Sequence, residues 1–227
     1  MMTNRVVESI TSQYEIVLGS SSPRRYEIMH DTMGFPEVTI MKPSFEEDLD
    51  KSHFLDPIEY VRETSYHKAV AIIEDLSKVS EFNAGAKLVI CADTVVIDSS
   101  GTIYEKPQCK KKQLTNLMKF CYENKDPLIV VTAVTLVKWI NKNDYSIKEP
   151  FHEETKVYCD PKTPIELLED YVESEEGIQV AGGFKIQGPS GVIIKKIEGD
   201  YYNVVGLPLN RLFQELYQWT RVPQQSA

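Results

Sequence analysis

The sequence predicts an α/β fold in which helices flank a mixed sheet. Apolar segments of strand length alternate with segments of helical periodicity along most of the 227 residues. One region breaks the alternation, because 128–140 and 145–159 read as a long antiparallel pair around a turn at 141–144. Parallel and antiparallel pairing in one chain gives a mixed sheet. We expect one domain over 14–220, with an extension at 1–13 and a polar tail at 221–227.

Two helix starts are clearly marked in the first half of the chain. Ser22 stands at the N-cap and Pro23 at the first helical position, where a missing N–H costs nothing. Asp56, Pro57 and Glu59 form a capping-box arrangement, with Asp in the Ser/Thr role. The elements expected here are strand 14–18, helix 23–33 ended by Gly34, an extended segment at 37–43, an acidic loop at 46–50, helix 57–79 and strand 87–98.

The second half opens with a hairpin and closes with a helix. Thr163, Pro164 and Glu166 repeat the pattern of a helix start. Glycines dominate the segment that follows this helix, and glycine within a strand pattern indicates a bulge or the close approach of a ligand. The elements expected here are a hairpin at 101–106, helix 110–123, strands 128–140 and 145–159, helix 164–173, glycine-rich strands within 181–198, a turn at 199–200 and a helix near 208–219.

Charge and apolar content exclude several classes of function. The formal net charge is −9, which argues against nucleic-acid binding through a broad basic face. The most apolar run, 128–140, is too short to span a bilayer and contains Lys138. The first residues lack the basic and apolar character of a secretion signal. We therefore expect a cytoplasmic protein that contacts neither membranes nor nucleic acid.

Cysteine and histidine spacings give no disulfide framework and no zinc motif. The absence of a C-x-x-C pair fits reduced thiols better than a set of disulfides. The absence of H-x-x-x-H spacing argues against a zinc hydrolase. The four cysteines are Cys91, Cys109, Cys121 and Cys159.

Segment 14–25 joins a strand end to a helix start with an anion-binding composition. Apolar residues at 16–18 run into Gly19 and three serines, and then into Arg24 and Arg25. Free backbone N–H groups and the positive end of the helix dipole meet there, beside hydroxyl and guanidinium groups. This combination favours a phosphate site. The alternative is an ordinary strand-to-helix turn with solvated arginines.

Asp93 is the second strong signal, because it interrupts a run so apolar that it reads as a central strand buried on both faces. A lone buried carboxylate is costly, so it needs a metal, a role as a base or a partner. The alternative is a structural salt bridge or a turn at the strand end. We interpret Asp93 as functional.

Weaker signals come from four other charged residues. Lys68 borders the apolar face of its helix, and either points into a cleft to bind phosphate or extends to solvent. Glu46 and Glu47 either complete a magnesium site with Asp93 or form a solvated acidic loop. Lys106 precedes a rigid proline, and is either a second phosphate-binding cation or an ordinary surface lysine.

Gln187 stands between Ile186 and Gly188 in the glycine-rich segment. Its amide carries both donors and an acceptor, which suits the edge of a pyrimidine base. The alternative is a bulged strand with a structural glutamine.

Taken together and in order over about 200 residues, these stretches resemble the Maf family of nucleoside triphosphate pyrophosphatases. One such motif is weak, but eight in the family's order are specific. The matching stretches are Ser20-x-Ser-Pro-Arg-Arg25, Pro43-Ser44-x-Glu-Glu47, Tyr60-Val61 with Lys68-Ala69, Ala92-Asp93-Thr94-Val95-Val96, Glu105-Lys106-Pro107, Ala181-Gly182-Gly183, Ile186-Gln187-Gly188, and Ile197-x-Gly-Asp-Tyr-x-Asn-Val-Val-Gly-Leu-Pro-Leu209.

The resemblance implies a Maf/ITPase-like arrangement of two lobes around a central cleft, and a homodimer. It implies hydrolysis of a nucleoside triphosphate to the monophosphate and pyrophosphate, with a divalent metal, Mg²⁺ or Mn²⁺. Asp93 matches the family's catalytic aspartate, which is assigned as proton acceptor and competes for the role of metal ligand. Glu47 matches an acidic residue at the metal site.

The resemblance also implies substrate-binding residues. Ser20, Arg24, Lys68 and Lys106 match positions that contact the triphosphate. The positions that separate the subgroup acting on dTTP and UTP from the one acting on 7-methyl-GTP match Arg24, Thr94 and Gln187, and they look like the first subgroup.

One departure from the family pattern opens two further hypotheses. Gln179 and Val180 stand where the family usually has Asp-Lys, so a cation near the cleft is missing unless Lys185 replaces it. A regulatory protein that binds nucleotide and catalyses weakly is therefore an alternative to the dTTP/UTP pyrophosphatase. A pyrophosphatase that acts on a different base, either on modified pyrimidine nucleotides or on 7-methyl-GTP, is the other alternative.

Overall fold

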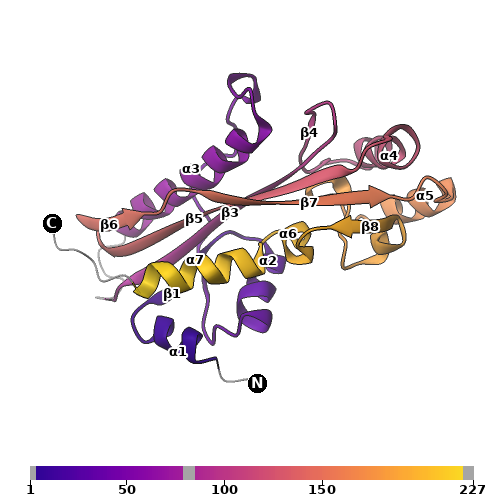
Figure 1. The fold of residues 1–227 in the computed structure, drawn as a ribbon. Helices are drawn as coiled ribbons and strands as arrows, with labels where there is room; N and C mark the ends of the chain where they lie inside the picture. Colours follow the sequence, from indigo (N-terminus) through magenta and orange to yellow (C-terminus); the bar gives the residue numbers. More distant parts are fainter. Residues whose placement is uncertain (1–3, 79–84, 222–227) are drawn as a thin grey trace.

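The computed structural model describes residues 4–78 and 85–221, and its centre is an eight-stranded sheet (Figure 1). The strand order is β2-β1-β3-β5-β7-β8, with β4 also paired to β3 and β6 to β5. β2, β1 and β3 run parallel and the other pairs run antiparallel, so the predicted mixed sheet is confirmed. The strands are β1 Glu15–Gly19, β2 Thr39–Ile40, β3 Lys87–Ile97, β4 Ile103–Tyr104, β5 Leu128–Asn141, β6 Asp144–Ile147, β7 Phe151–Cys159 and β8 Ile194–Glu198.

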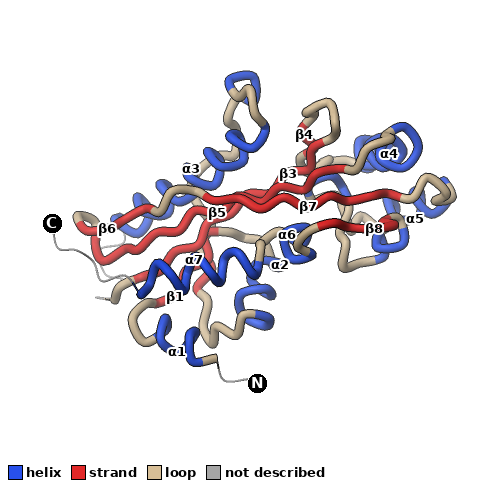
Figure 2. The backbone as a smooth tube through the Cα atoms, in the orientation of Figure 1, coloured by secondary structure: helices blue, strands red, loops and turns tan. Residues whose placement is uncertain are grey.

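Helices cover both faces of this sheet (Figure 2). Successive side chains of a strand point to opposite faces. In β3, Val89 and Cys91 pack against α3, whereas Leu88 and Ile90 pack in the cluster that contains α1, α2 and α7. Helices α4 and α5 pack together at the end of the sheet that lies away from α1 and β6 (Figure 1). The helices are α1 Arg5–Thr11, α2 Pro23–Glu27, α3 Pro57–Lys78, α4 Lys110–Met118, α5 Ile165–Glu173, α6 Tyr201–Val205 and α7 Leu209–Arg221.

Strand β3 has an unpaired edge between the end of β1 and the point where β4 begins to pair with it. β1 pairs with β3 only as far as Gly19, which lies opposite Cys91. β3 continues six residues further, to Ile97, so Asp93 and Thr94 lie just beyond the end of the parallel neighbour. Ligand sites in α/β sheets are commonly found outside the carboxyl ends of parallel strands.

The prediction of glycine-rich strands within 181–198 is wrong for most of that segment. Gly182 and Gly183 have φ values of +73° and +83°, a left-handed conformation that is incompatible with a strand. They form a 3-10 turn at Ala181–Gly183, and Pro189 begins a second 3-10 turn at Pro189–Val192. Pairing starts only at Ile194, where β8 joins the sheet.

Three further boundaries differ from the predictions. The predicted strand 145–159 is split into β6 and β7, because Pro150 cannot donate to the ladder between them. Thr163 does not cap α5, since its hydroxyl donates to the Asp160 carbonyl and Pro164 takes the N-cap position. The short helix α6 was not predicted. It turns out to hold residues of the site.

The remaining helix predictions are confirmed with small changes. The predicted helices 23–33 and 110–123 form α2 and α4, each continued by one π turn, at Ile28–Thr32 and Lys119–Glu123. All four cysteines are free thiols. Among the described residues, every helix is too short or too polar to span a bilayer. The predictions for positions 1–3, 79 and 222–227 lie outside the described residues.

Candidate active site

A cavity of about 670 Å³ lies at the free edge of β3, beside the end of β1. Gln187 is exposed and does not belong to its wall. The other predicted site residues all line it: Ser20, Arg24, Glu47, Lys68, Asp93, Thr94 and Lys106.

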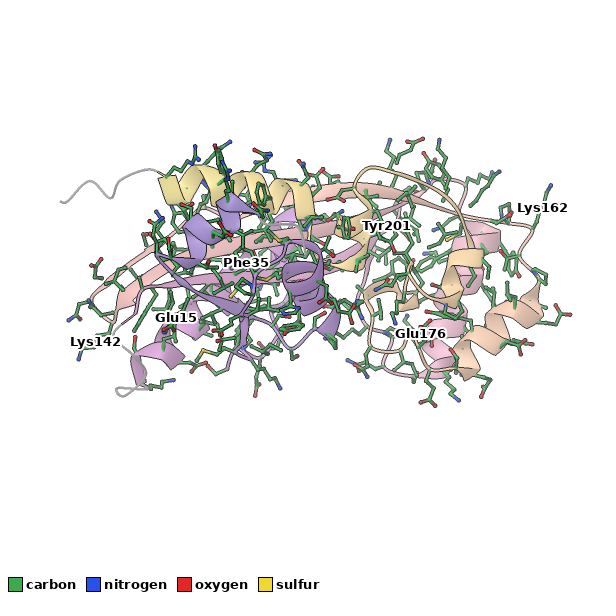
Figure 3. All side chains as sticks on the ribbon, turned by 90° about the horizontal axis from the view of Figure 1, so that it is seen from below. Glu15, Phe35, Lys142, Lys162, Glu176 and Tyr201 are labelled. Atoms are coloured by element: carbon green, nitrogen blue, oxygen red, sulfur yellow. The ribbon has the colours of Figure 1, made fainter. Side chains whose placement is uncertain are left out.

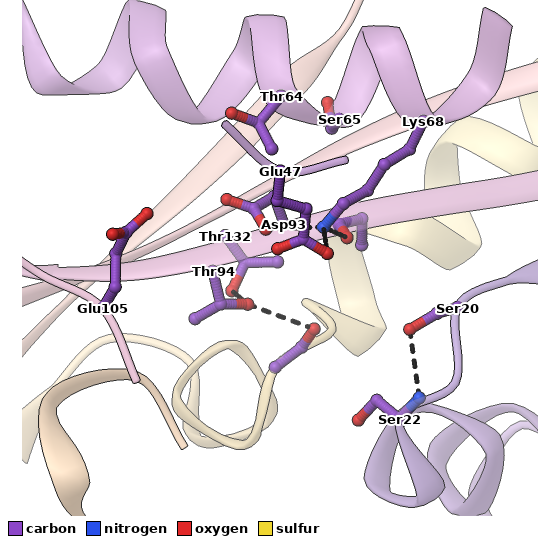
Figure 4. Close-up of polar contacts among 12 residues, drawn as sticks. Ser20, Ser22, Glu47, Thr64, Ser65, Lys68, Asp93, Thr94, Glu105 and Thr132 are labelled. Carbon is purple, nitrogen blue, oxygen red and sulfur yellow. Dashed lines mark hydrogen bonds and ion pairs between the residues drawn. The ribbon is translucent and has the colours of Figure 1, made fainter. Parts of the chain in front are cut away.

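Two carboxylates and one ammonium form the centre of this cavity (Figure 4). Lys68 Nζ lies 2.7 Å from Asp93 Oδ1 and 2.9 Å from Glu47 Oε1. The side chains of Lys68 and Asp93 are only 6% and 12% exposed, whereas that of Glu47 is 48% exposed. Lys68 therefore points into the cavity and not to solvent, and its ammonium pairs with two carboxylates, so its contact with phosphate stays a prediction. Asp93 has the partner that a buried carboxylate requires.

The surroundings keep Glu47 ionised. Burial alone would raise the pKa of this carboxyl, but the ammonium of Lys68 more than offsets it, with help from Lys106 and Arg25, and the pKa lies below its ordinary value. Glu46 is exposed and does not line the cavity. Of the acidic pair seen in the sequence, only Glu47 reaches the site.

Two arginines add positive charge to the wall of the cavity. Arg25 donates to Ser20 Oγ at 3.1 Å, to Thr94 Oγ1 at 3.0 Å and to the Gly206 carbonyl at 2.8 Å. Arg24 donates to the Val205 carbonyl at 3.2 Å. Burial lowers the pKa of both guanidinium groups. Within the described part of the chain neither arginine forms an ion pair, so both charges are available to an anion.

The serine turn, residues 20–22 between β1 and α2, also lines the cavity and offers donors to an anion. Ser20 Oγ accepts from the backbone N–H of Ser22 at 3.2 Å, and Pro23 takes the first helical position as predicted. Ser22 occupies the N-cap, but its hydroxyl makes no capping hydrogen bond within the structure described. That hydroxyl and the nearby backbone N–H groups can therefore serve a ligand.

The hairpin that carries Lys106 is fixed by contacts that the sequence did not reveal. Tyr60 donates its hydroxyl to Glu105 Oε1 at 2.7 Å, and Lys51 lies 2.8 Å from Glu105 Oε2. Burial and this hydrogen bond raise the pKa of Tyr60. The backbone N–H of Gly182 donates to the Glu105 carbonyl at 3.2 Å. These contacts hold Lys106 at the rim of the cavity.

A third part of the wall is apolar and includes the departure from the family pattern. Val96, Phe184 and Val204 belong to one buried cluster and line the cavity. Gln179 and Val180 also line it, without a charge. The expected substitute, Lys185, pairs with Glu176 at 3.3 Å and does not line the cavity.

Glu47 and Asp93 are the groups that could hold a divalent metal. Among the described residues, no cluster of three His, Cys, Asp or Glu side chains is arranged for metal binding. Each of these two carboxylates uses one oxygen for Lys68, and the second oxygen has no hydrogen-bond partner in the described structure. A set of two carboxylates fits Mg²⁺, which completes its coordination with substrate phosphates and water.

Comparison with known proteins finds relatives over nearly the whole chain. Residues 15–219 match the family described as Maf-like protein. A protein of Saccharomyces cerevisiae named dTTP/UTP pyrophosphatase is 55% identical over 217 residues, which cover 93% of each chain. A protein of Schizosaccharomyces pombe with the same name is 38% identical over 208 residues, which cover 88% of this chain and 81% of the relative.

A solved structure titled "Structure of a HAM1 protein from Coxiella burnetii" aligns with 91% of this chain and 100% of its own, at 13% identity and a TM-score of 0.44. The family match, by contrast, spans most of the chain, and the Saccharomyces cerevisiae relative is more than half identical to it. This chain belongs to the Maf-like protein family.

Proposed function

We propose that this chain hydrolyses dTTP and UTP to the nucleoside monophosphate and pyrophosphate. The observation that carries the proposal is one cavity that joins a buried carboxylate, Asp93, to a serine turn and to two guanidinium groups that form no ion pair with any described residue. Two relatives that align with most of this chain are named dTTP/UTP pyrophosphatase.

The division of charge in the cavity suits a triphosphate. Arg24, Lys106 and the serine turn provide donors and positive charge for phosphate oxygens. Hydrogen bonds hold Arg24 and the serine turn in place before substrate arrives, and preorganised charge is usually the largest contribution to such a reaction. The apolar part of the wall offers a surface for the base.

Asp93 is the residue that we assign to the chemical step. It orients or deprotonates the water that attacks the α-phosphorus, or it holds the metal, and both roles need the ionised carboxylate. Lys68 keeps Asp93 fixed and paired until substrate binds. A divalent cation bound by Glu47 and Asp93 would neutralise charge on the phosphates.

The assay that tests the proposal measures pyrophosphate and orthophosphate released from dTTP, UTP, CTP, GTP, ATP and 7-methyl-GTP, with Mg²⁺ or Mn²⁺. We expect pyrophosphate from dTTP and UTP. Hydrolysis in ¹⁸O-water should place the label in the monophosphate, because water attacks the α-phosphorus. Orthophosphate as the product, or ¹⁸O in the pyrophosphate, would contradict the proposal, and release from 7-methyl-GTP alone would favour the other substrate class.

A nucleotide-binding protein with weak catalysis is the second candidate. It is favoured by Gln179 and Val180, which leave this part of the wall uncharged. A folded protein that binds dTTP or UTP but releases no pyrophosphate with either metal would support it. The homodimer and the cytoplasmic location stay predictions, which light scattering of the purified protein and imaging of the tagged protein in cells can test.

A further inference from the structure

A buried hydroxyl behind the cavity wall contacts one of the residues that line it. Thr132 lies on β5 directly opposite Thr94 on β3. It is 0% exposed and does not line the cavity. Its Oγ1 lies 2.9 Å from Thr94 Oγ1 and 3.0 Å from the backbone carbonyl oxygen of Asn203 in α6. Thr132 can therefore influence a ligand only through other residues.

The direction of these two hydrogen bonds is determined by the Asn203 carbonyl. A carbonyl oxygen only accepts, and a threonine hydroxyl has one proton, so Thr132 donates that proton to Asn203. The N–H of Leu207, four residues after Asn203, donates to the Tyr202 carbonyl instead. Thr132 supplies the donor that this buried carbonyl would otherwise lack. It can then only accept from Thr94.

The carbonyl is held firmly in place. Asn203 Nδ2 donates to the Val130 carbonyl and to Thr155 Oγ1, both at 3.0 Å. Thr155 in turn donates to the Asp200 carbonyl at 2.9 Å. These bonds tie the backbone of α6 to β5 and β7, so the acceptor that orients Thr132 does not depend on a flexible side chain.

The hydroxyl of Thr94 is thereby polarised. One lone pair accepts from Arg25 Nη2 at 3.0 Å, and the proton points to Thr132 at 2.9 Å. The Gly206 carbonyl lies further away, at 3.5 Å, and already accepts from Arg25. Only the second lone pair of Thr94 Oγ1 is therefore left to face the cavity. Toward a ligand, Thr94 is an acceptor and not a donor.

The neighbouring wall indicates which part of a nucleotide Thr94 meets. Val96 lies two residues along β3 and therefore on the same face as Thr94. Val96 packs with Phe184 and Val204, and all three line the cavity. A planar heterocycle can lie on this apolar surface with its polar edge against Thr94.

We propose that Thr132 is a positioning residue, which makes Thr94 the acceptor for the ring N–H of a uracil or thymine base. The inference rests on the function proposed above. Uracil and thymine present N3–H between two carbonyl oxygens, so an acceptor can pair only with N3–H on that edge. Cytosine carries a lone pair at N3, which would face the lone pair of Thr94. The buried hydroxyl thus contributes to selection between bases without touching them.

The wild-type protein gives the first test. We would measure kcat/KM for UTP, CTP, 3-methyl-UTP and 5-methyl-UTP. The 3-methyl group removes the N–H, whereas the 5-methyl group adds similar bulk and keeps it. We expect at least about a tenfold loss for CTP and 3-methyl-UTP relative to UTP, and a small change for 5-methyl-UTP. Equal use of 3-methyl-UTP and 5-methyl-UTP would overturn the inference.

A pair of substitutions tests Thr132 itself. Thr132→Val keeps the shape and removes the hydroxyl, so the proton of Thr94 becomes free to turn to the cavity. The ratio of kcat/KM for UTP to that for CTP should then fall about tenfold, while Thr132→Ser keeps the hydroxyl and the ratio. A purely structural effect would lower kcat/KM for UTP and for CTP by the same factor and leave their ratio unchanged. A folded Thr132→Val protein with an unchanged ratio would therefore contradict the proposal.

Failure of the inference and failure of the proposed function give different results. If no nucleotide releases pyrophosphate, the proposed function fails, and calorimetric affinities for UTP, CTP and 3-methyl-UTP then supply the same ratios. If Thr132→Val does not fold, as judged by circular dichroism, Thr132→Ala, which also removes the hydroxyl, takes its place in the comparison of UTP with CTP, because the wild-type protein alone does not test Thr132.

Discussion

The ammonium of Lys68 lies 2.7 Å from the carboxylate of Asp93, and both side chains are almost completely enclosed. This pair joins α3 to β3 at the point where β3 loses its parallel neighbour. Figure 3 shows that side chains fill the space between the elements. Among the described residues, the buried charged side chains are Lys68, Lys87, Asp93, Asp98 and Lys138. The pair is therefore both a structural link and the centre of the site.

Removal of Lys68 should destabilise the protein strongly. Lys68→Met leaves Asp93 without its cation in a buried place, so we expect the free energy of unfolding to fall by about 3 kcal/mol. Lys78→Met is the matched control, because this lysine is on the same helix with its side chain 68% exposed, and its loss should change stability by less than about 0.5 kcal/mol. Urea denaturation measures both. Equal effects of the two substitutions would contradict the assignment of Lys68–Asp93 as a buried pair.

Glu47 and Glu46 should differ in metal dependence. Glu47→Gln removes one of the two carboxylates at the site, and the Mg²⁺ concentration for half-maximal activity should rise at least about tenfold. Glu46→Gln, one residue away and outside the cavity, should leave it unchanged. Magnesium titrations of pyrophosphate release provide the measurement. A similar shift in both variants would remove Glu47 from the metal site.

Asp98 should make stability depend on pH in the acid range. Burial would raise its pKa, but hydrogen bonds from Ser100, Lys119, Tyr104 and Thr102 more than offset it, and the pKa lies well below its ordinary value. A carboxyl with a lowered pKa contributes stability above its unfolded-state value, about 4, and loses the contribution as pH falls through the folded-state value.

Asp98→Asn should therefore cost about 2 kcal/mol at pH 7, and the difference from wild type should shrink steadily below about pH 4. Urea midpoints between pH 7 and pH 2 would show this. Exposed Asp126 supplies the control substitution to Asn. A difference that stays constant with pH would contradict the account of Asp98, which fixes the turn before the hairpin of Lys106.

Gly101 and Gly182 both have a left-handed backbone, but only Gly182 is crowded, so alanine substitutions at the two positions distinguish backbone strain from steric crowding. Gly101 has a φ of +80° and open space around it, so Gly101→Ala should cost about 1 kcal/mol. Gly182 has a φ of +73°, and an added Cβ would lie 2.7 Å from Val96 Cγ2. Gly182→Ala should cost at least about 2 kcal/mol more and raise KM, because Val96 belongs to the cavity wall. Equal costs for both would contradict the packing described for Gly182.

Some parts of the site could be predicted because the signal is local. Asp93 stands out as a carboxylate in an apolar strand, and the serine turn is contiguous in sequence. Thr132 gives a similar signal, a hydroxyl in the apolar run 128–140, and the reasoning used for Asp93 could have found it. Arg25 was part of the recognised motif, but its contacts with Thr94 and Gly206 depend on the tertiary structure.

Other parts could not be predicted because they depend on distant contacts or on backbone conformation. Tyr60 and Glu105 are 45 positions apart, and nothing in either local pattern indicates their hydrogen bond. The interpretation of Gln187 assumed a strand, whereas Gly182 and Gly183 adopt left-handed conformations and Gln187 is exposed. Composition indicates that glycines permit such a turn, but it does not show the direction in which the chain leaves it.

The most direct test of the account compares pyrophosphate release from dTTP by the wild-type protein and by Asp93→Asn, at saturating Mg²⁺ and nucleotide. The substitution keeps the shape of the side chain and removes its charge. We predict that kcat falls at least about 100-fold in a folded variant, the low end for loss of a general base. A folded Asp93→Asn protein that releases pyrophosphate at nearly the wild-type rate would contradict the central role of this carboxylate.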